Sequence, residues 1–272
     1  MICFPNAKIN IGLNITSKRS DGFHEIQSIF YPVKNLQDGL EIVENKESDA
    51  IEFTSSGIAI SGNSNENLCV KAYHLIKKIC DVPPIKIHLN KHIPIGAGMG
   101  GGSADAAFFI QLINKKFKLN LSYQQMFDAA TTIGSDCAFF LENKPCYVKG
   151  RGEILQPIEL DLSNYNLVII YPNIHISTKE AYAGVVPKIS EQNILDHIHK
   201  PVSEWSGFIY NDFEVSIFET HPQLKKIKQQ LYTQGASYAS MSGSGSTMFG
   251  LFKNSYETNK LNFENEHLVF DL

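Results

Sequence analysis

The segment Pro94-Ile-Gly-Ala-Gly-Met-Gly-Gly-Gly-Ser-Ala104 decides how the rest of the chain is interpreted. Five of the seven residues from Gly96 to Gly102 are glycines, and a helix-compatible stretch follows them. Glycine lets the backbone approach an anion closely and adopt positive φ. The first N–H groups of a helix have no partner inside the helix and carry a partial positive charge. The segment therefore predicts a phosphate-binding turn at a helix N-terminus, to which Ser103 adds a hydroxyl. A merely flexible turn is the simpler alternative.

Two common phosphate motifs fit this turn poorly. Gly96, Gly98 and Gly101 match the dinucleotide pattern G-x-G-x-x-G, but that pattern should follow its strand directly, and Lys91-His-Ile-Pro94 intervenes. A second strand should also end in Asp or Glu about 20 residues later, where this chain has Leu119-Asn-Leu-Ser122. A P-loop needs a lysine that the turn lacks. The turn alone thus predicts phosphate binding, with a nicotinamide dinucleotide as an alternative ligand.

Hydrophobic periodicity predicts a chain of mixed helices and strands. Capping boxes at Ser122-x-x-Gln125 and Ser177-x-x-Glu180 predict two helix starts. Apolar residues alternate in several short stretches and recur at helical spacing in others. Strands are expected at 8–15, 23–31, 85–89, 167–171, 236–241 and 247–252, and helices at 68–79, 104–117, 122–134, from 177 and at 222–234. This pattern favours an α+β fold of the two-layer α/β kind in two domains, 1–155 and 156–272.

The composition is that of a globular enzyme. The chain has 272 residues, of which 43% are hydrophobic and 19% charged, with a net charge of -4. A nucleic-acid binder would carry a basic surface, so the charge argues against one. Five cysteines without a C-x-x-C pair indicate reduced thiols in the cytoplasm. No stretch is apolar enough to span a bilayer. We expect a cytoplasmic protein with no membrane or nucleic-acid partner, either a monomer or a weak homodimer.

Catalytic candidates lie outside the glycine-rich turn. Lys8 and Asn10 alternate with apolar residues, which predicts that they share the polar face of a half-buried strand. Asp136 stands between Gly134-Ser135 and an apolar stretch, a context that suits a carboxylate in a cleft. The simpler interpretations are a solvated lysine and a helix-capping aspartate.

Three segments together resemble the motifs of the GHMP kinase family. They are Pro5-Asn-Ala-Lys-Ile-Asn-Ile-Gly12, the segment from Pro94 to Ser103, and Ser242-Gly-Ser-Gly-Ser246, and they span nearly the whole chain. The resemblance implies a two-domain kinase with its active site in the cleft between the domains, using ATP with Mg²⁺. It places the ATP phosphates on the following residues: Pro94, Ile95, Gly96, Ala97, Gly98, Met99, Gly100, Gly101, Gly102, Ser103 and Ala104.

Roles for single residues follow from the same resemblance. Asp136 would accept or orient the proton of the acceptor hydroxyl, and Lys8 would stabilise that carboxylate or the transferring phosphoryl group. Asn10 would bind the substrate. Gly243, Ser244 and Gly245 would support the phosphate turn, with a plain hairpin turn as the alternative. The histidine pairs lack a carboxylate-histidine signature, so no protein metal site is expected and Mg²⁺ should arrive with ATP.

The acceptor is inferred from Arg19-x-Asp21-Gly22-Phe23-His24. Within the family this segment implies a cytidine-diphosphate-linked methylerythritol, phosphorylated on its 2-hydroxyl in isoprenoid synthesis. Phe23 and Tyr182 would flank the cytosine, and His24 would bind its edge. Many relatives have tyrosine at position 23, so a hydroxyl contact is lost here. Ordinary packing explains such aromatic residues equally well without the resemblance.

Three other functions stay open from the sequence. A different GHMP kinase, acting on mevalonate, homoserine or a sugar, would ignore the cytidine group. A nicotinamide oxidoreductase would bind the dinucleotide instead of ATP, and a nucleotide-binding protein without catalysis would not transfer a phosphoryl group.

Overall fold

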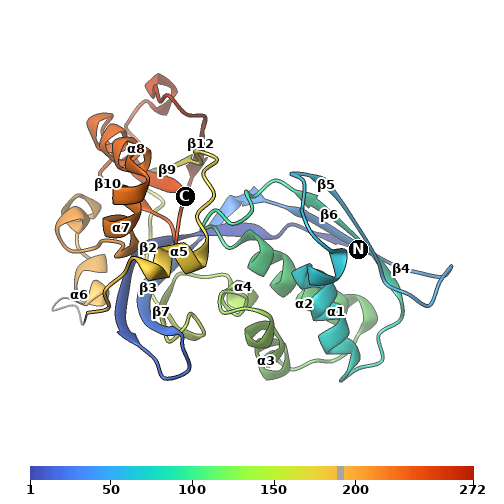
Figure 1. Cartoon of the computed structure of the whole chain (residues 1–272). Helices are drawn as coiled ribbons and strands as arrows, with labels where there is room; N and C mark the ends of the chain where they lie inside the picture. The colour runs from blue at the N-terminus through green and yellow to red at the C-terminus, as the bar shows by residue number, and fades with distance from the viewer. Residues whose placement is uncertain (189–192) are drawn as a thin grey trace. The chain divides into compact units, whose positions relative to one another are not determined.

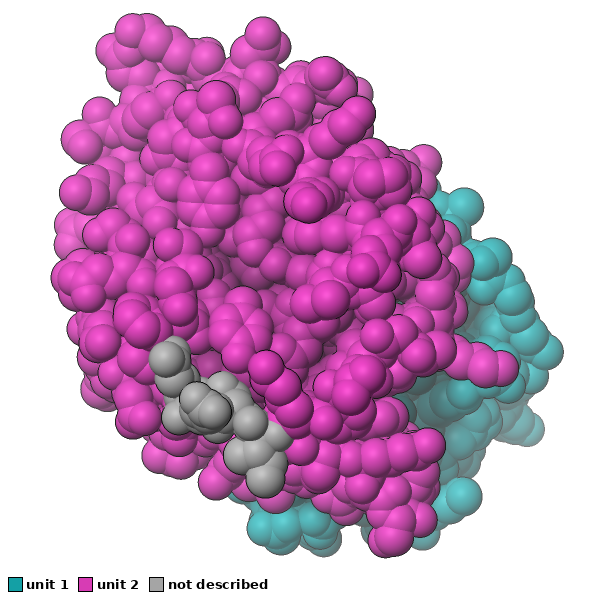
Figure 2. Space-filling view, turned by 60° about the vertical axis from the view of Figure 1, so that its left-hand side comes forward, with its two compact units in different colours: residues 1–7, 36–95, 100–144 teal, residues 8–35, 96–99, 145–272 magenta. Residues whose placement is uncertain are grey.

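The computed structural model describes residues 1–188 and 193–272, shown in Figure 1. Its contacts divide the chain into two compact units, coloured separately in Figure 2. Unit 1 comprises residues 1–7, 36–95 and 100–144, and unit 2 comprises residues 8–35, 96–99 and 145–272. Each unit is assembled from several stretches of chain, whereas the sequence suggested one boundary near residue 155. That boundary stays a prediction.

Unit 1 combines one four-stranded sheet with four helices. The strands run in the order β1 (Ile2–Cys3), β4 (Gly39–Glu44), β6 (Ile85–Lys91) and β5 (Glu52–Gly57), and only the β5–β6 pair is parallel. The helices are α1 (Leu68–Lys77), α2 (Gly101–Phe117), α3 (Tyr123–Ile133) and α4 (Phe139–Glu142), with a 3₁₀ turn, η1 (Ser64–Glu66), before α1. Helices α1, α2 and α3 pack against one another.

The predicted helices of unit 1 are confirmed, and their caps explain their bounds. Asn67 accepts a hydrogen bond from the Cys69 amide and starts α1. At α3 both halves of the capping box form, since Ser122 accepts from the Gln125 amide and the Gln125 side chain accepts from the Ser122 amide. Gly134 closes α3, as the sequence predicted. Helix α2 begins at Gly101, three residues earlier than its apolar pattern indicated.

Unit 2 holds most of two further sheets. One has the order β2 (Asn6–Lys18), β3 (His24–Gln37), β7 (Cys146–Lys149) and β8 (Ile154–Pro157). The other is antiparallel, in the order β10 (Tyr238–Met241), β11 (Met248–Lys253), β9 (Tyr165–Ile170) and β12 (His267–Asp271). The helical segments are α5 (Thr178–Ala183), α6 (Ile194–Ile198), η2 (Val202–Gly207), α7 (Phe213–Thr220), α8 (Pro222–Thr233) and η3 (Thr258–Lys260).

The core of unit 2 fills the space between its second sheet and its helices. Ile217 of α7 and Leu224, Ile227 and Leu231 of α8 belong to one buried cluster with apolar residues of β9, β10 and β11. Their helical spacing places these side chains on one face of each helix. The predicted helix at 222–234 and the strands at 236–241 and 247–252 are thereby confirmed, shifted by at most two residues.

The predicted half-buried strand at 8–15 is wrong in one respect. Strand β2 exists, but ten consecutive residues from Asn6 to Ile15 are buried, on both faces of the strand. Lys8 and Asn10 are only 2% and 1% exposed. The alternation in sequence separates an apolar face from a polar one. Here the polar face is covered by Ser28 and the Phe30 ring instead of water. Among the described residues, no helix is long and apolar enough to cross a membrane.

Candidate active site

The glycine-rich turn has the backbone that a phosphate cradle needs. Gly96, Gly98 and Gly100 have φ of +67°, +78° and +68°, in the left-handed region that favours glycine. Gly100 is the N-cap residue of α2, and as a glycine it has no side chain that could cap the helix start. The Ala104 amide donates to the Gly100 carbonyl at 2.9 Å, so α2 is regular from its first turn. Its leading N–H groups are therefore suited to bind an anion.

Residues 96–99 of the turn belong to unit 2, where they form hydrogen bonds with the segments around Lys8 and Ser242. The Lys8 amide donates to the Met99 carbonyl at 3.0 Å, and the Ser242 hydroxyl donates to the Gly98 carbonyl at 2.8 Å. Ser242 also accepts from the Asn10 amide at 3.1 Å. A Cβ at Gly98 would lie 2.0 Å from the Ser242 carbonyl oxygen, so only glycine fits there. Segments more than 200 residues apart thus meet at this turn.

The Ser242–Ser246 segment joins β10 to β11, so it is a hairpin turn as well as a neighbour of the phosphate turn. Gly243 has φ of +57°, and its Cβ position lies 3.2 Å from the Gly98 Cα and 3.3 Å from the Asn10 Oδ1. The Asn211 side chain donates to the Gly243 carbonyl at 2.8 Å and to the Met241 carbonyl at 2.8 Å. Asn211 therefore holds this turn in place.

Lys8 and Asn10 form a buried polar group on β2. The Lys8 Nζ donates to the Asn10 Oδ1 and lies 4.4 Å from the centre of the Phe30 ring. The Asn10 Nδ2 donates to the Ser28 hydroxyl at 2.9 Å, and Ser28 donates to the Gly12 carbonyl at 2.6 Å. This chain of hydrogen bonds fixes the side chain of Asn10 and, through it, the ammonium of Lys8.

Asp136 lies in unit 1, in the turn between α3 and α4. The Cys137 amide donates to the Gly134 carbonyl at 3.1 Å and closes that turn. Ala138 is the N-cap residue of α4, and its side chain forms no capping hydrogen bond. Asp136 is therefore not the N-cap residue of α4. Lys8 belongs to unit 2, so the pairing of Lys8 with Asp136 stays a prediction.

The aromatic residues expected at the base lie in unit 2. The rings of His24 and Tyr182 stack, with their centres 4.6 Å apart and an angle of 23° between them. Tyr182 in turn meets the Phe213 ring edge-on at 4.9 Å. Burial, with a smaller contribution from Lys18, lowers the pKa of His24. Phe23 is 51% exposed, so its ring is open to a ligand.

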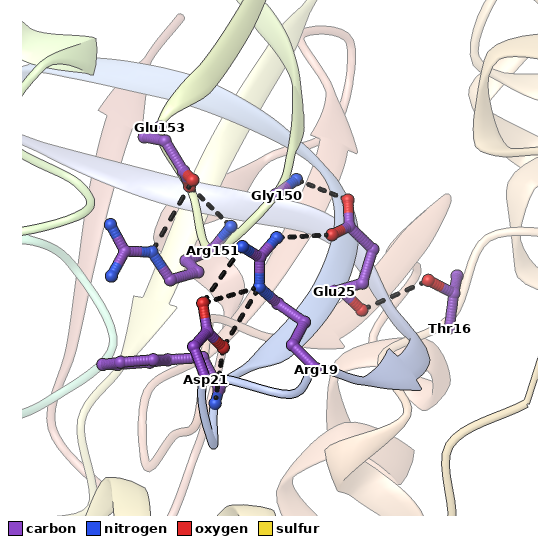
Figure 3. Close-up of polar contacts among 8 residues, drawn as sticks. Thr16, Arg19, Asp21, Glu25, Gly150, Arg151 and Glu153 are labelled. Carbon is purple, nitrogen blue, oxygen red and sulfur yellow. Dashed lines mark hydrogen bonds and ion pairs between the residues drawn. The ribbon is translucent and has the colours of Figure 1, made fainter.

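A network of charged side chains, shown in Figure 3, surrounds the turn that carries Phe23. Arg19 pairs with Asp21 at 3.0 Å and with Glu25 at 3.0 Å. Asp21 accepts from the Phe23 amide at 3.1 Å, and Glu25 accepts from the Gly150 amide at 2.8 Å. We call Arg19, Asp21, Glu25, Arg151 and Glu153 the hairpin network.

Arg151 also lies beside Phe23, although no sequence motif singles it out. Its guanidinium carbon lies 4.9 Å from the centre of the Phe23 ring, and its Nε lies 3.6 Å from Glu153. It comes from the turn between β7 and β8, more than 120 residues after Phe23. No local pattern links the two positions, and only the pairing of β3 with β7 brings them together.

Three charged side chains that no sequence motif singles out are buried in unit 1. We call Asp38, Lys91 and Asp105 the buried cluster. The Lys91 Nζ donates to a carboxylate oxygen of Asp38 and, at 2.9 Å, to Asp105. One signal was visible in the sequence: Lys91 continues the alternation of Ile87 and Leu89, which puts a lysine on the apolar face of a strand.

A cavity of about 270 Å³ lies in unit 1 beside the start of α1. Its lining includes Phe53 and Ile60 together with polar groups of Asn63, Ser64 and Asn67. Leu68 follows Asn67 in the chain, and its Cδ1 lies 3.7 Å from the position that a Cβ would take at Gly102 in the phosphate turn. An apolar and amide-lined space is thus close to the phosphate turn. Among the described residues, no group of three His, Cys, Asp or Glu side chains is placed to hold a metal ion.

The fold and the site together define an ATP-dependent small-molecule kinase. The model of the GHMP kinase N-terminal domain matches residues 67–144, and that of the GHMP kinase C-terminal domain matches residues 198–261. The first match contains Asp136 and the whole phosphate turn, and the second contains the Ser242–Ser246 turn.

Comparison with individual proteins narrows this class. The chain is 52% identical over 254 residues to a protein of Bacteroides thetaiotaomicron, covering 93% of this chain and 92% of that one. It is 47% identical over 265 residues to a protein of Bacteroides fragilis, covering 97% and 96%. Both are named 4-diphosphocytidyl-2-C-methyl-D-erythritol kinase. A crystal structure of 4-(cytidine 5'-diphospho)-2C-methyl-D-erythritol kinase is similar with a TM-score of 0.82 and 27% identity over 99% of this chain and 98% of that chain.

The chain therefore belongs to the GHMP kinases and, within them, to the family of 4-diphosphocytidyl-2-C-methyl-D-erythritol kinases. The predicted α+β fold and the assignment to this kinase family are confirmed.

Proposed function

We propose that this protein transfers the γ-phosphoryl group of ATP to the 2-hydroxyl of 4-diphosphocytidyl-2-C-methyl-D-erythritol, giving the 2-phosphate and ADP in isoprenoid precursor synthesis. Relatives with this name are 47% and 52% identical over nearly their whole length. The observation that carries the proposal is the junction in unit 2 where Lys8, Asn10 and Ser242 surround the phosphate turn. It supplies a fixed ammonium and a fixed amide beside the place of the phosphates.

The reaction forms a bond between the substrate oxygen and the γ-phosphorus and breaks the bond from that phosphorus to the bridging oxygen of ADP. The proton of the acceptor hydroxyl passes to Asp136, and Lys8 stabilises the charge on the reacting oxygens. Phosphoryl transfer requires alignment and charge neutralisation more than covalent help. The amide groups at the start of α2 and the hydroxyl of Ser103 hold the phosphates during transfer.

For the cytidine end, we assign the stacked pair of His24 and Tyr182 and the exposed ring of Phe23 to the base. A neutral His24 can both donate and accept a hydrogen bond at the cytosine edge. Its lowered pKa supports the neutral form. Stacking contributes about 1 to 3 kcal/mol per base in nucleic-acid sites. Phe23 provides the ring face without the tyrosine hydroxyl.

The adenosine of ATP is assigned to the cavity that includes Phe53, Ile60 and Asn67, because an apolar wall with amide groups suits a purine. Mg²⁺ would enter with ATP, bound to its phosphate oxygens and to water, and would neutralise part of their charge. We further propose a cytoplasmic enzyme with a small-molecule substrate and no nucleic-acid or membrane partner, acting as a monomer or weak homodimer.

The direct test is ADP release by purified protein with Mg-ATP and one of two acceptors. Turnover is expected with 4-diphosphocytidyl-2-C-methyl-D-erythritol and not with mevalonate. No turnover with the first acceptor, in a preparation that binds Mg-ATP, would refute the proposed substrate.

The catalytic roles are tested separately with Asp136→Asn and Lys8→Ala. Both variants should bind Mg-ATP with affinity close to that of the wild type and turn over slower by orders of magnitude. Near-normal rates in both variants would show that neither residue takes part in the chemistry.

A further inference from the structure

Three charged side chains are buried in unit 1 close to the phosphate turn, and the proposed reaction uses none of them. Lys91 ends β6, Asp38 precedes β4 and Asp105 lies in the second turn of α2. Their side chains are 3%, 0% and 4% exposed. Charged side chains are rarely buried so completely unless they are paired, since leaving water costs several kcal/mol per ion. The arrangement of this buried cluster therefore calls for a structural or functional reason.

Asp38 holds the chain that leads into the phosphate turn. Its Oδ1 accepts hydrogen bonds from the His92 amide at 2.6 Å and from the Ile93 amide at 2.8 Å. Its Oδ2 accepts from the Lys91 Nζ. His92 and Ile93 directly precede Pro94, where the glycine-rich segment begins. The carboxylate thus fixes the backbone on the strand side of the turn.

Lys91 connects this carboxylate to the helix side of the turn. Its Nζ donates to the Asp105 Oδ2 at 2.9 Å. A Cβ at Gly101, the first residue of α2, would lie 2.9 Å from the Lys91 Nζ and 2.9 Å from the Ile93 Cγ2. The ammonium therefore packs directly against the start of the helix, and it leaves no room for a side chain there.

We propose that Asp38, Lys91 and Asp105 are positioning residues that hold the phosphate turn in the shape that binds the triphosphate of ATP. A cradle of backbone N–H groups binds an anion best when its groups are aligned in advance, because alignment then costs nothing on binding. The buried cluster ties the strand side at His92 and Ile93 to the helix side at Gly101. This inference rests on the proposed role of the turn in ATP binding, and not on the identity of the acceptor.

The protonation of Asp105 provides a readout that is specific to this arrangement. Its Oδ1 is buried and has no hydrogen-bond partner among the described residues. Burial, with a contribution from Asp38 and against the attraction of Lys91, raises the pKa of Asp105 to about 7. Besides those two groups, Cys3 of β1 and Cys69 of α1 face it. The cluster thus changes from neutral to one net negative charge as the pH rises through about 7, and that charge opposes an anion at the nearby helix start.

The experiment measures Mg-ATP binding by calorimetry and the Michaelis constants of both substrates. Asp38→Asn keeps the acceptor for the two amides and weakens the hold on Lys91. We expect its Michaelis constant for ATP to rise roughly tenfold, with that of the alcohol acceptor unchanged. The matched control is Lys86→Met, on the same strand, whose partners Glu47 and Glu52 lie at the surface. This control should leave both constants unchanged.

A second variant, Asp105→Asn, has nearly the same shape and no charge at any pH. The ATP affinity of the wild type should fall as the pH rises through about 7 more steeply than that of Asp105→Asn. Comparing the two proteins cancels the titration of ATP itself.

Equal rises of both Michaelis constants in Asp38→Asn, or a lowered melting temperature alone, would overturn the proposal. Should Asp38→Asn fail to fold, parallel pH profiles of wild type and Asp105→Asn would overturn it. Calorimetry measures the binding of Mg-ATP without an acceptor. If the proposed acceptor were not phosphorylated, the proposed substrate would be refuted, but the calorimetric test of the buried cluster would still be valid.

Discussion

The buried cluster and the hairpin network are built from the same kinds of side chains in opposite surroundings. Lys91, Asp38 and Asp105 are at most 4% exposed, whereas Arg19 and Asp21 of the hairpin network are 34% and 42% exposed. The pKa shifts of their carboxyl groups have opposite signs. Hydrogen bonding to Arg19 lowers the pKa of Asp21, and burial raises that of Asp105. The largest influence on the pKa of the exposed Asp21 is its hydrogen bond to Arg19, and the largest influence on that of the buried Asp105 is desolvation.

This difference predicts which cluster determines stability. A surface pair loses little when one partner is removed, because water replaces it. A buried pair that loses one partner leaves a charge without compensation. The two clusters hold turns of comparable importance for the proposed reaction, one for phosphate and one for the base. We therefore expect mutations in the buried cluster to affect folding and binding together, and mutations in the hairpin network to affect binding almost alone.

The largest effect is expected for Lys91→Ala. It removes the cation between Asp38 and Asp105 and leaves the buried carboxylate of Asp38 without a counter-charge. Removing one partner of a buried pair typically costs about 3 to 5 kcal/mol in the free energy of unfolding, which urea titration would measure. Lys86→Ala, on the same strand with exposed partners, is the control and should change stability little. If both variants lost the same stability, burial would not distinguish the two regions.

A smaller effect is expected for the pH dependence of stability in Asp105→Asn. The pKa of Asp105 is raised from 3.8 to about 7 in the folded protein, so the folded state holds a proton that the unfolded chain releases. This contribution is present below about pH 4 and is lost as the pH rises through about 7. Urea titrations over this range should show wild-type stability falling relative to that of Asp105→Asn. Parallel curves would mean that Asp105 titrates in the folded protein as it does in water.

The same contrast shows what the sequence could and could not predict. Strand β2, the capping box of α3 and the glycine-rich turn follow from residues that are adjacent in the chain, so local patterns predicted them. The buried cluster joins residues 38, 91 and 105, and the contact between Arg151 and Phe23 depends on strand pairing. Periodicity assigns a side chain to a face of a strand, and only the tertiary structure decides what covers that face. For this reason Lys8 and Asn10 were expected on a solvent-exposed face and are buried.

A still smaller effect is expected for Arg19→Met in the hairpin network. Asp21 still accepts from the Phe23 amide and Glu25 from the Gly150 amide after the arginine is lost, so both backbone contacts of the turn survive. The melting temperature should change little, and the small advantage of the wild type should shrink at high salt, because salt screens exposed charges. Scanning calorimetry at low and high salt measures this. If Arg19→Met lost as much stability as Lys91→Ala, the hairpin network would be as important for folding as the buried cluster.

The smallest effect is expected for Arg151→Ala. Its guanidinium packs on the Phe23 ring, and an exposed contact of this kind contributes about 0.5 to 1 kcal/mol. If the guanidinium keeps the ring oriented for the base, the Michaelis constant of the cytidine-bearing acceptor should rise roughly two- to fivefold, with kcat and the constant for ATP unchanged.

A double-mutant cycle with Phe23→Leu isolates this contact from any direct contact between Arg151 and the substrate. Where the guanidinium acts through the ring, Arg151→Ala should have no further effect once Phe23 is leucine, and the two changes will not add. Full additivity would show that Arg151 acts independently of Phe23. Arg151→Lys keeps the charge with a weaker fit to the ring face, so it should lie between the wild type and Arg151→Ala. A Michaelis constant between those of the wild type and Arg151→Ala would indicate that Arg151 affects acceptor binding by orienting the Phe23 ring.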